Sequence, residues 1–499
     1  MENNQQSGYF NARVNTQFIY VFSMKNLANP FLQFFLLWVS IHGFAQNNNN
    51  VAKAIDGLFA SYNENTPGVA VAVVKNGTIV FKKGYGQATL EYDVPITSQT
   101  IFHAASVSKQ FTAFAIYLLE KDGQISFDDN VRAYFPELPD YGKIIKIKHL
   151  LSHTSGLRDQ WALLTLAGWS LEDVITTEQI LDLAYNQKEL NFEPGTAFGY
   201  CNTSYTLLAK LVEKISGQSF AEFTKQQIFE PLQMDHTQFH DDHQKVVKNR
   251  AYSYEFKNGG YSKKELNYSN VGPTSLFTTV EDLAKWANNY DNPVVGDKKL
   301  IRRFNRVSTF ENGEAVVYRQ TQKDTLYHAK GQLIWNHKGH RLMSHGGHDA
   351  GFRAFLARFP DDGLTIITLS NDEHYDILKK GFEIADTYLN EERSKKENQD
   401  LLPKSKSTTA FKNNIKEFMG SYASEELKTT YEVLYENDAL VLKHHRLGHM
   451  KLAQQGEATF TGSNYFNFQL TFLKEKGKVT GFSISNFGVK NLMFAKIDS

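Results

Sequence analysis

A serine and a lysine three residues apart, at the start of a strongly apolar segment, are the residues that point first to chemistry. Ser106 and Lys109 lie in the tetrapeptide Ser-Val-Ser-Lys, and bulky apolar side chains recur on every side of residues 107–119. Such a segment predicts a buried helix, in which residues three apart share one face, so the Lys109 amine should reach the Ser106 hydroxyl. Serine is a weak nucleophile at its ordinary pKa, and a lysine whose pKa is depressed by burial can accept its proton. The pair therefore predicts nucleophilic catalysis.

Two later segments support this hypothesis, because Ser-x-x-Lys alone occurs by chance and serine is a common helix N-cap. Tyr200 and Asn202 stand between a Glu-Pro-Gly loop and an amphipathic helix, and residues 345–347, His-Gly-Gly, precede two strand patterns. A tyrosine can act as a general base near neutral pH only when a cation lies beside it. Taken singly, a tyrosine and an asparagine at a loop–helix junction are more often structural residues that satisfy local backbone groups.

In this order, the three segments resemble the motifs of the serine β-lactamase and penicillin-binding protein superfamily, nearest its class C branch. The resemblance covers roughly residues 55–390 and extends through residues 149–157, 192–195 and 231–234. It implies acyl transfer in two steps, in which Ser106 attacks a carbonyl and water then hydrolyses the acyl-enzyme. The expected activity is that of a serine hydrolase.

The resemblance also implies a role for each motif residue. Tyr200, as a phenolate or through protons shared with Lys109, would be the general base, and Asn202 would donate hydrogen bonds to the substrate and to Lys109. The backbone N–H groups of Ser106 and His348 would form the oxyanion hole. The expected catalytic residues are Ser106, Lys109 and Tyr200, and the expected substrate-binding residues are Asn202, His345, Gly346, Gly347 and His348. No metal ion or other cofactor is expected.

One departure from the family pattern bears on the substrate. Typical β-lactamases and transpeptidases have Lys-Thr-Gly where this chain has His345, Gly346 and Gly347. Gly346 offers no side-chain donor, and a histidine is mostly neutral near neutral pH, which weakens recognition of a β-lactam carboxylate. Hydrolysis of small esters, amides or D-peptides is therefore favoured over strong β-lactamase activity. The alternative is a non-hydrolytic penicillin- or peptide-binding sensor or scaffold on the same fold.

The three motifs lie within a predicted α+β domain, residues 46–390. Residues 69–74 and 79–82 are strand patterns joined by Asn-Gly, which predicts a hairpin. Residues 352–359 and 364–369 predict two more strands of one sheet, followed by a helix able to pack on it. Because helical patterns fill most of the chain between these strands, we expect an antiparallel sheet flanked by helices, with an all-helical subdomain.

A small β barrel is predicted at the C-terminal end. Residues 391–410 have the charged and polar composition of a linker, and residues 411–499 contain seven short strand patterns separated by turn residues. This region resembles the lipocalin-like barrels appended to some members of the superfamily. Its interior could bind a ligand, or the domain could cap the active-site cleft. Its aromatic residues, among them Tyr465, Phe466, Phe468 and Phe472, are expected to form mainly its core.

The N-terminal region has the layout of a secretory signal. A short apolar run, residues 31–41, follows Met-Lys and ends in small residues that a signal peptidase reads. We expect residues 24–45 to be the signal peptide, residues 1–23 to be an upstream mis-start, and the exported chain to begin near Gln46. The expected location is periplasmic or extracellular, without stable membrane insertion after cleavage. An uncleaved anchor or a buried helix is the alternative.

Composition excludes some partners and leaves others open. The 54 basic and 54 acidic residues balance, so no basic excess would drive binding to nucleic acid, and a small molecule or peptide is the expected partner. With a single cysteine, Cys201, no disulfide can form within the chain, and a buried, inert thiol is the expectation. A metal site built from His337, His340, His345 and His348 is disfavoured, because strand alternation and the Gly pair would scatter them.

Overall fold

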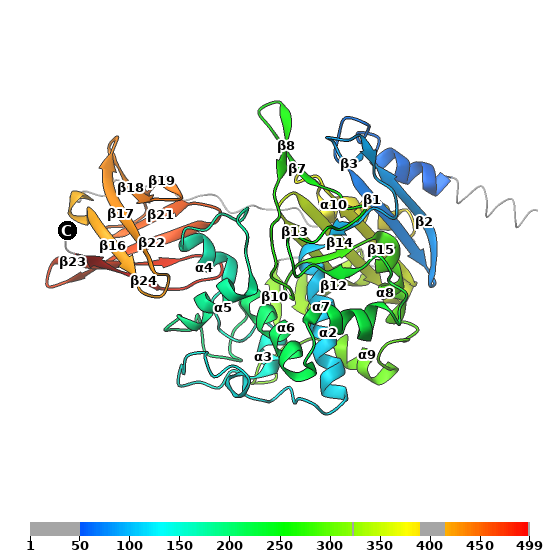
Figure 1. Ribbon diagram of the computed structural model, residues 1–499, viewed down its shortest axis with the longest axis horizontal. Coiled ribbons are helices and arrows are strands. Elements are labelled where there is room, and N and C mark those ends of the chain that lie inside the picture. Colours follow the sequence, from blue (N-terminus) through cyan, green and yellow to red (C-terminus); the bar gives the residue numbers. More distant parts are fainter. Residues whose placement is uncertain (1–49, 322–323, 390–414, 498–499) are drawn as a thin grey trace, which may run out of the picture. The chain divides into compact units, whose positions relative to one another are not determined.

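The computed structural model describes residues 50–321, 324–389 and 415–497 of the chain (Figure 1). The predicted signal peptide, the upstream segment before it and the predicted linker at residues 391–410 lie outside the described residues. Their boundaries therefore stay predictions. Among the described helices, none has the length and apolar character that a bilayer span requires.

An eight-stranded antiparallel sheet organises the first part of the structure, with the strand order β10-β11-β12-β13-β14-β15-β1-β2 (Figure 1). Its strands are β1 (Val69–Lys75), β2 (Thr78–Tyr85), β10 (Val317–Gln320), β11 (Thr325–His328), β12 (Leu333–His337), β13 (His340–Asp349), β14 (Phe352–Phe359) and β15 (Leu364–Ser370). The first strand pairs with β15, from Val69 opposite Ser370 to Lys75 opposite Leu364. Strands from the two ends of the predicted domain thus join in one sheet, which confirms the α+β prediction.

The predicted Asn-Gly hairpin is present between β1 and β2. Asn76 and Gly77 have φ values of +49° and +80°, the left-handed conformations that a two-residue turn of this type requires. The turn residues therefore set the register in which β2 continues the sheet.

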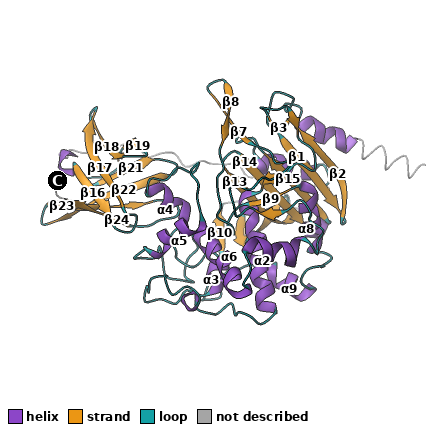
Figure 2. Cartoon of the chain, in the orientation of Figure 1, coloured by secondary structure: helices purple, strands orange, loops and turns teal. Residues whose placement is uncertain are grey.

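Most of the described helices lie in the chain between β2 and β10, and α10 follows β15 (Figure 2). They are α2 (Ser108–Lys121), α3 (Ile147–Leu151), α4 (Gln160–Leu166), α5 (Thr177–Tyr185), α6 (Asn202–Ser216), α7 (Phe220–Thr224), α8 (Val280–Asn289), α9 (Lys298–Phe304) and α10 (Ile377–Asp386). The helix α8 contacts β1 and β15, whereas α10 contacts β14 and β15. Buried residues occur on every side of α2, as the sequence predicted for the helix after Ser106.

Three small sheets connect the helical segments. They are the pairs β3 (Gln87–Thr89) with β4 (Val94–Pro95) and β7 (Ser253–Lys257) with β8 (Gly260–Lys264), and the set β5 (Phe102–His103), β9 (Leu276–Thr278) and β6 (Gln238–Phe239). The pairing of β5 with β9 fixes the chain just before Ser106.

The C-terminal residues form a nine-stranded antiparallel near-barrel, in the order β19-β18-β17-β16-β24-β23-β22-β21-β20. Its strands are β16 (Gly420–Ser424), β17 (Thr429–Glu436), β18 (Ala439–His444), β19 (Gly448–Lys451), β20 (Ala453–Gln454), β21 (Thr459–Ser463), β22 (Asn467–Glu475), β23 (Lys478–Ser485) and β24 (Leu492–Ile497). The two end strands, β19 and β20, are consecutive in the chain, so the sheet curls back on itself through Leu452. The all-β prediction is confirmed.

The barrel has nine strands where the sequence predicts seven, and β16 is one of those that were missed. The sequence of β16, Gly-Ser-Tyr-Ala-Ser, carries a single large apolar residue, Tyr422, and no alternating pattern. Pairing with β17 and β24 on its two sides makes it a strand, and the Tyr422 side chain is fully buried. Tertiary pairing has outweighed local preference here.

The hydrophobic core of the barrel includes part of α4. Ala162, Leu163 and Leu166 are buried among the barrel's apolar side chains, and the Tyr431 hydroxyl donates to the Leu166 carbonyl at 2.9 Å. Both sheets thus belong to one compact unit, residues 55–499. The interior that the sequence left open to a ligand is occupied by side chains, including those of this helix.

Truncation of Leu163 tests the shared core. Leu163→Ala removes a side chain that is 1% exposed, and we expect the free energy of unfolding to fall by about 2–5 kcal/mol in urea denaturation. Val246→Ala, at a position that is 83% exposed, is the control and should change the stability by no more than about 0.5 kcal/mol. Equal effects of the two substitutions would show that α4 does not belong to the barrel core in solution.

Candidate active site

Ser106 lies on a short 3₁₀ turn that leads into α2. This turn, η1 (Ala105–Val107), begins with Ala105 at a φ of +47°, a left-handed conformation that residues other than glycine rarely adopt. The Ser108 hydroxyl holds the turn, because it donates to the Ala105 carbonyl at 2.5 Å and accepts the Leu276 N–H at 3.1 Å. Backbone strain of this kind persists where surrounding contacts over-determine it. Ser106 is thereby held half-buried at the entrance of a buried helix.

Lys109 reaches back to Ser106 from the first turn of α2. Its side chain is fully buried, and its Nζ lies 3.0 Å from Ser106 Oγ, 2.7 Å from Asn202 Oδ1 and 2.8 Å from the Pro273 carbonyl oxygen. The oxygens of Asn202 and Pro273 can only accept hydrogen bonds. A neutral amine has two hydrogens and one lone pair, so its hydrogens go to these two oxygens and its lone pair faces Ser106. That is the arrangement a general base requires.

Burial makes the neutral form of Lys109 accessible. Loss of hydration lowers the pKa of Lys109 from 10.5 to about 7, while the carboxylates of Asp349 and Asp159 act in the opposite direction. Near neutral pH the amine is therefore present in both its charged and its neutral form. It can take a proton from Ser106 and later return one.

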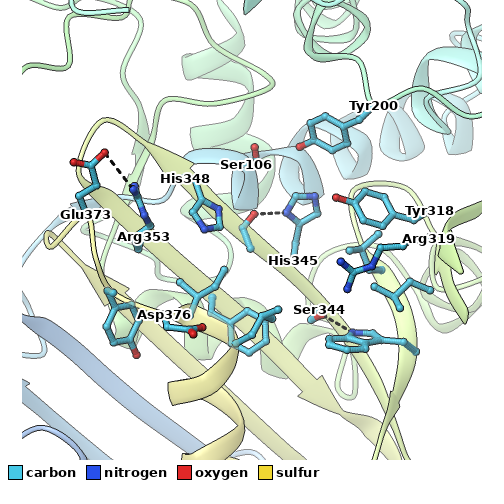
Figure 3. Close-up of a pocket in the computed structure, with 18 residues that line it drawn as sticks. Ser106, Tyr200, Tyr318, Arg319, Ser344, His345, His348, Arg353, Glu373 and Asp376 are labelled. Carbon is cyan, nitrogen blue, oxygen red and sulfur yellow. Dashed lines mark hydrogen bonds and ion pairs between the residues drawn. The ribbon is translucent and has the colours of Figure 1, made fainter. Parts of the chain in front are cut away.

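Tyr200 stands beside the same hydroxyl in its protonated form. The Tyr200 hydroxyl points toward Ser106 in Figure 3, and its ring packs against the buried ring of His153, with centroids 4.4 Å apart. Burial raises the pKa of Tyr200 well above its ordinary value, although a hydrogen bond with Ser106 acts to lower it. The site therefore favours Lys109 as the proton acceptor and Tyr200 as a neutral donor, where the sequence hypothesis gave Tyr200 the role of base.

A carboxylate that the sequence analysis did not single out orients Asn202. Asp159 Oδ2 accepts the backbone N–H and the Nδ2 of Asn202, both at 2.7 Å, which turns Asn202 Oδ1 toward Lys109. Asp159 Oδ1 caps α4 by accepting the N–H groups of Trp161 at 3.0 Å and Ala162 at 3.3 Å. Asn202 therefore accepts a hydrogen bond from Lys109, whereas the resemblance implied that it donates one.

The predicted third motif forms the part of β13 beside the Ser106 turn. The strand β12 pairs with β13 only as far as Leu333 opposite Ser344, so the next residues of β13 leave one edge open. Gly347 allows the close packing, because a Cβ there would lie 2.3 Å from the Ala104 carbonyl oxygen. An open strand edge can offer backbone N–H groups to a substrate oxygen. The predicted oxyanion-hole role of the His348 and Ser106 N–H groups is compatible with this position and stays a prediction.

The side chains of this motif supply neither a cation nor a hydroxyl. Burial and the nearby Lys109 amine lower the pKa of His345 to about 3, so the ring is neutral, and its Nδ1 lies 2.6 Å from the Gly346 carbonyl oxygen. Of the two arginines that line the cleft, Arg353 lies 3.7 Å from Glu373, whereas Arg319 has no ion pair within the described residues (Figure 3).

The cleft has two lobes that meet at the catalytic residues. Ser106, Tyr200, His348, Arg353 and Glu373 line both of them. The first, which we call the sheet lobe, has a volume of about 610 Å³ and is lined further by residues of β10, β12, β13 and the start of α10. The second, the barrel lobe, has a volume of about 360 Å³ and is lined further by the aromatic residues Trp161, Tyr268, Tyr465, Phe466 and Phe487.

The geometry of the site supports neither a cysteine nucleophile nor a histidine metal site. The Cys201 thiol is buried, and burial raises its pKa to about 11, which disfavours the reactive thiolate. His337 lies 2.7 Å from Asp386 and His340 lies 2.9 Å from Asp362, so these two rings have separate carboxylate partners. Within the described ranges, no group of three or more metal-ligating side chains is arranged to hold an ion.

Comparison with known proteins gives a family match over most of the chain. Residues 55–389 match the family described as beta-lactamase. Penicillin-binding protein 4* of Bacillus subtilis is 30% identical over 319 residues, which are 61% of this chain and 68% of that protein. The D-aminopeptidase of Brucella anthropi is 30% identical over 309 residues, 62% of this chain and 56% of that protein. The chain thus matches little more than half the length of that aminopeptidase.

Solved structures share the fold at lower identity. The octameric penicillin-binding protein homologue from Pyrococcus abyssi is 21% identical with a TM-score of 0.59, covering 91% of this chain and 100% of that one. The D-amino acid amidase from Ochrobactrum anthropi SV3 is 21% identical with a TM-score of 0.57, covering 69% of this chain and 97% of that one. Because the match to the Pyrococcus abyssi structure covers 91% of this chain, it extends into the C-terminal barrel.

The bond from Asp159 to Asn202 can be tested with a fluorophosphonate that labels an activated serine. In Asp159→Asn an amide NH₂ replaces one acceptor oxygen, so either Asn202 or the α4 cap loses its partner. We expect labelling of Ser106 to slow about 10- to 100-fold. Removing this negative charge also lowers the pKa of Lys109, so the pH midpoint of labelling should move down.

A matched control is Asp297→Asn, because Asp297 caps the equally short α9 by accepting the Leu300 N–H at 2.8 Å. Its labelling rate and pH midpoint should equal those of the wild type. If the two variants behave alike, Asp159 acts only as a helix cap and does not position Asn202.

Proposed function

The chain belongs to the beta-lactamase family and is a serine hydrolase, and from this we propose that it cleaves small esters, amides or D-peptides through an acyl-enzyme on Ser106. The observation that carries the proposal is the distance of 3.0 Å between the Nζ of the buried Lys109 and Ser106 Oγ. Export to the periplasm or beyond the cell is part of the proposal, since the apolar run at residues 31–41 has the layout of a signal sequence.

In the acylation step, neutral Lys109 takes the Ser106 proton as Ser106 Oγ bonds to the substrate carbonyl carbon. The carbonyl oxygen gains negative charge and is stabilised by backbone N–H groups at the open edge of β13 and at Ser106. As the tetrahedral intermediate collapses, the bond to the leaving group breaks. Tyr200 donates its proton to that group and recovers one from protonated Lys109.

In the deacylation step, water replaces the leaving group. Neutral Lys109, directly or through Tyr200, takes a proton from the water as its oxygen bonds to the acyl carbon. The ester bond to Ser106 then breaks, and the proton returns to Ser106 Oγ. Lys109 and Tyr200 end in the states in which they began, so the cycle needs no other reactant.

The side chains of the β13 motif support ester and amide substrates more than β-lactams. His345 is neutral and Gly346 has no side chain, so β13 provides none of the side-chain donors with which the family's Lys-Thr-Gly motif holds a β-lactam carboxylate. A D-aminopeptidase and a D-amino acid amidase among the similar proteins support D-amino-acid amides as the first substrates to test.

The proposed reaction is tested with p-nitrophenyl butyrate, D-alanyl p-nitroanilide and nitrocefin. We expect turnover of the ester or the D-amide, slow turnover of nitrocefin, and a loss of at least about 1000-fold in Ser106→Ala, since the covalent step is removed. Ser108→Ala is the matched control within the same motif: its rate should fall through loosening of the turn, but Ser106 should still be labelled by a fluorophosphonate. Fast nitrocefin turnover would contradict the substrate proposal, and labelling without any turnover would favour a penicillin- or peptide-binding sensor.

The pH dependence of kcat/KM tests Lys109 as the base. Because Lys109 must be neutral to accept a proton and its pKa is about 7, kcat/KM should decrease about tenfold for each pH unit below that value and level off above it. Circular dichroism at each pH serves as the control for folding. A rate that rises only above about pH 9 would instead indicate a phenolate base.

A further inference from the structure

The wall of the barrel lobe is built from two parts of the chain that are far apart in sequence. Trp161 on α4 and Tyr268 form one side, with ring centroids 4.9 Å apart and planes at 29°. Phe466 and Phe487, from two loops of the barrel, form the other, with centroids 4.7 Å apart and planes at 68°. Four aromatic rings, two from residues 161–268 and two from the barrel, therefore line one cavity that also reaches Ser106.

The barrel contributes rings that its own core does not need. Phe487 is 56% exposed, and Tyr465 beside it in the lobe is 47% exposed, whereas Phe468 and Phe472 are buried inside the barrel. The sequence predicts that the aromatic residues of this region lie mainly in its core, which holds for Phe468 and Phe472 and is wrong for Tyr465. Large apolar side chains gathered at an accessible surface commonly mark a binding site.

The loop that carries Phe487 is hydrogen-bonded to Asp159 and Asn191. The Gly488 carbonyl accepts the Asp159 N–H at 2.8 Å and Asn191 Nδ2 at 3.0 Å. Within the loop, Asn486 Oδ1 accepts the N–H groups of Gly488 at 3.0 Å and Val489 at 2.9 Å. Gly488 is required for the contact, because a Cβ there would lie 2.5 Å from the Asp159 Cβ. The position of Phe487 is thus fixed relative to the residue that orients Asn202.

The side chains that line the barrel lobe indicate which kind of group it would bind. Ring faces and edges form much of its wall, and its charged groups are Glu172, Lys264, Glu265, Asp349, Arg353 and Glu373. Within the lobe, Lys264 lies 3.8 Å from Glu172 and Arg353 lies 3.7 Å from Glu373. The other two carboxylates have partners just outside it, since Glu265 lies 3.0 Å from Lys263 and Asp349 lies 2.9 Å from the His103 ring. Each charged group of the lobe thus already has a polar partner. Offset and edge-to-face packing makes aromatic walls best suited to another aromatic ring.

We propose that the barrel lobe is a subsite for an aromatic side chain on the acyl group of the substrate, with Phe487 and Phe466 as specificity-determining residues. The inference rests on the proposed acyl-enzyme function and adds that the C-terminal barrel takes part in substrate selection. An acyl group attached to Ser106 Oγ lies where the two lobes meet, so a ring on that group can enter the lobe without moving the scissile bond.

Two boronic acids that add reversibly to an activated serine test the subsite without knowledge of the substrate. In full-length protein, 2-phenylethylboronic acid and ethylboronic acid compete with fluorophosphonate labelling of Ser106, and the ratio of their inhibition constants measures the preference for a ring. We expect the phenyl compound to bind the wild type at least about tenfold more tightly. In Phe487→Ala the ratio should fall toward one, while the constant for ethylboronic acid stays within about twofold.

Phe256→Ala is the matched control, because Phe256 is 50% exposed and packs edge-to-face on Tyr261 at 5.1 Å, much as Phe487 packs on Phe466. Its ratio should equal that of the wild type. If Phe487→Ala does not fold, Phe487→Leu keeps an apolar side chain without the ring and should lower the ratio in the same direction. An unchanged ratio in a folded Phe487 variant overturns the subsite and leaves the proposed hydrolase function intact. A wild type in which Ser106 is not labelled overturns the proposed function and this inference with it.

Discussion

The structure depends on keeping a lysine amine buried without a carboxylate in direct contact with it. Three oxygens lie within hydrogen-bond distance of Lys109 Nζ, those of the Ser106 hydroxyl, the Asn202 amide and the Pro273 carbonyl, and all three groups are neutral. A direct carboxylate partner would stabilise the charged form and hold the pKa near or above its ordinary value. Neutral partners form hydrogen bonds with the amine without stabilising its positive charge as strongly as a carboxylate would. Burial therefore has the largest effect on the pKa of Lys109. Asp159 and Asp349 do not contact Nζ directly, and their negative charges offset only part of the lowering of the Lys109 pKa by burial.

Much of this arrangement could be predicted from the sequence. The Ser106 and Lys109 pair, the Asn-Gly hairpin and the strands around Phe355 depend on local spacing and alternation, which are visible in a single chain. The motifs of Tyr200 and His345 were recognised by their order along the chain. The order of these motifs implies how the helices pack on the sheet, and it is this packing that brings Tyr200 and His345 close to Ser106.

Other parts could not be predicted, because their signals lie in contacts between distant residues. Asp159 looks in the sequence like an ordinary helix N-cap, and nothing local connects its second oxygen to Asn202, which follows 43 positions later. Similarly, β16 owes its extended conformation to the strands on its two sides. The direction of the hydrogen bond between Asn202 and Lys109 was misjudged for the same reason, since Asp159 determines it.

The barrel covers one side of the helix α4, and Asp159 is the N-cap of that helix. Folding of the barrel and ordering of Asp159 are therefore coupled. Leu163 and Leu166 find their final neighbours only when residues 415–497 have folded around them. Until then the helix exposes apolar surface, and its N-terminal cap lacks the support of Gly488. A chain that is still incomplete or only half folded is thereby kept from having an ordered proton-transfer site. An ordered proton-transfer site in this chain therefore requires the folded barrel as well as the residues around Ser106.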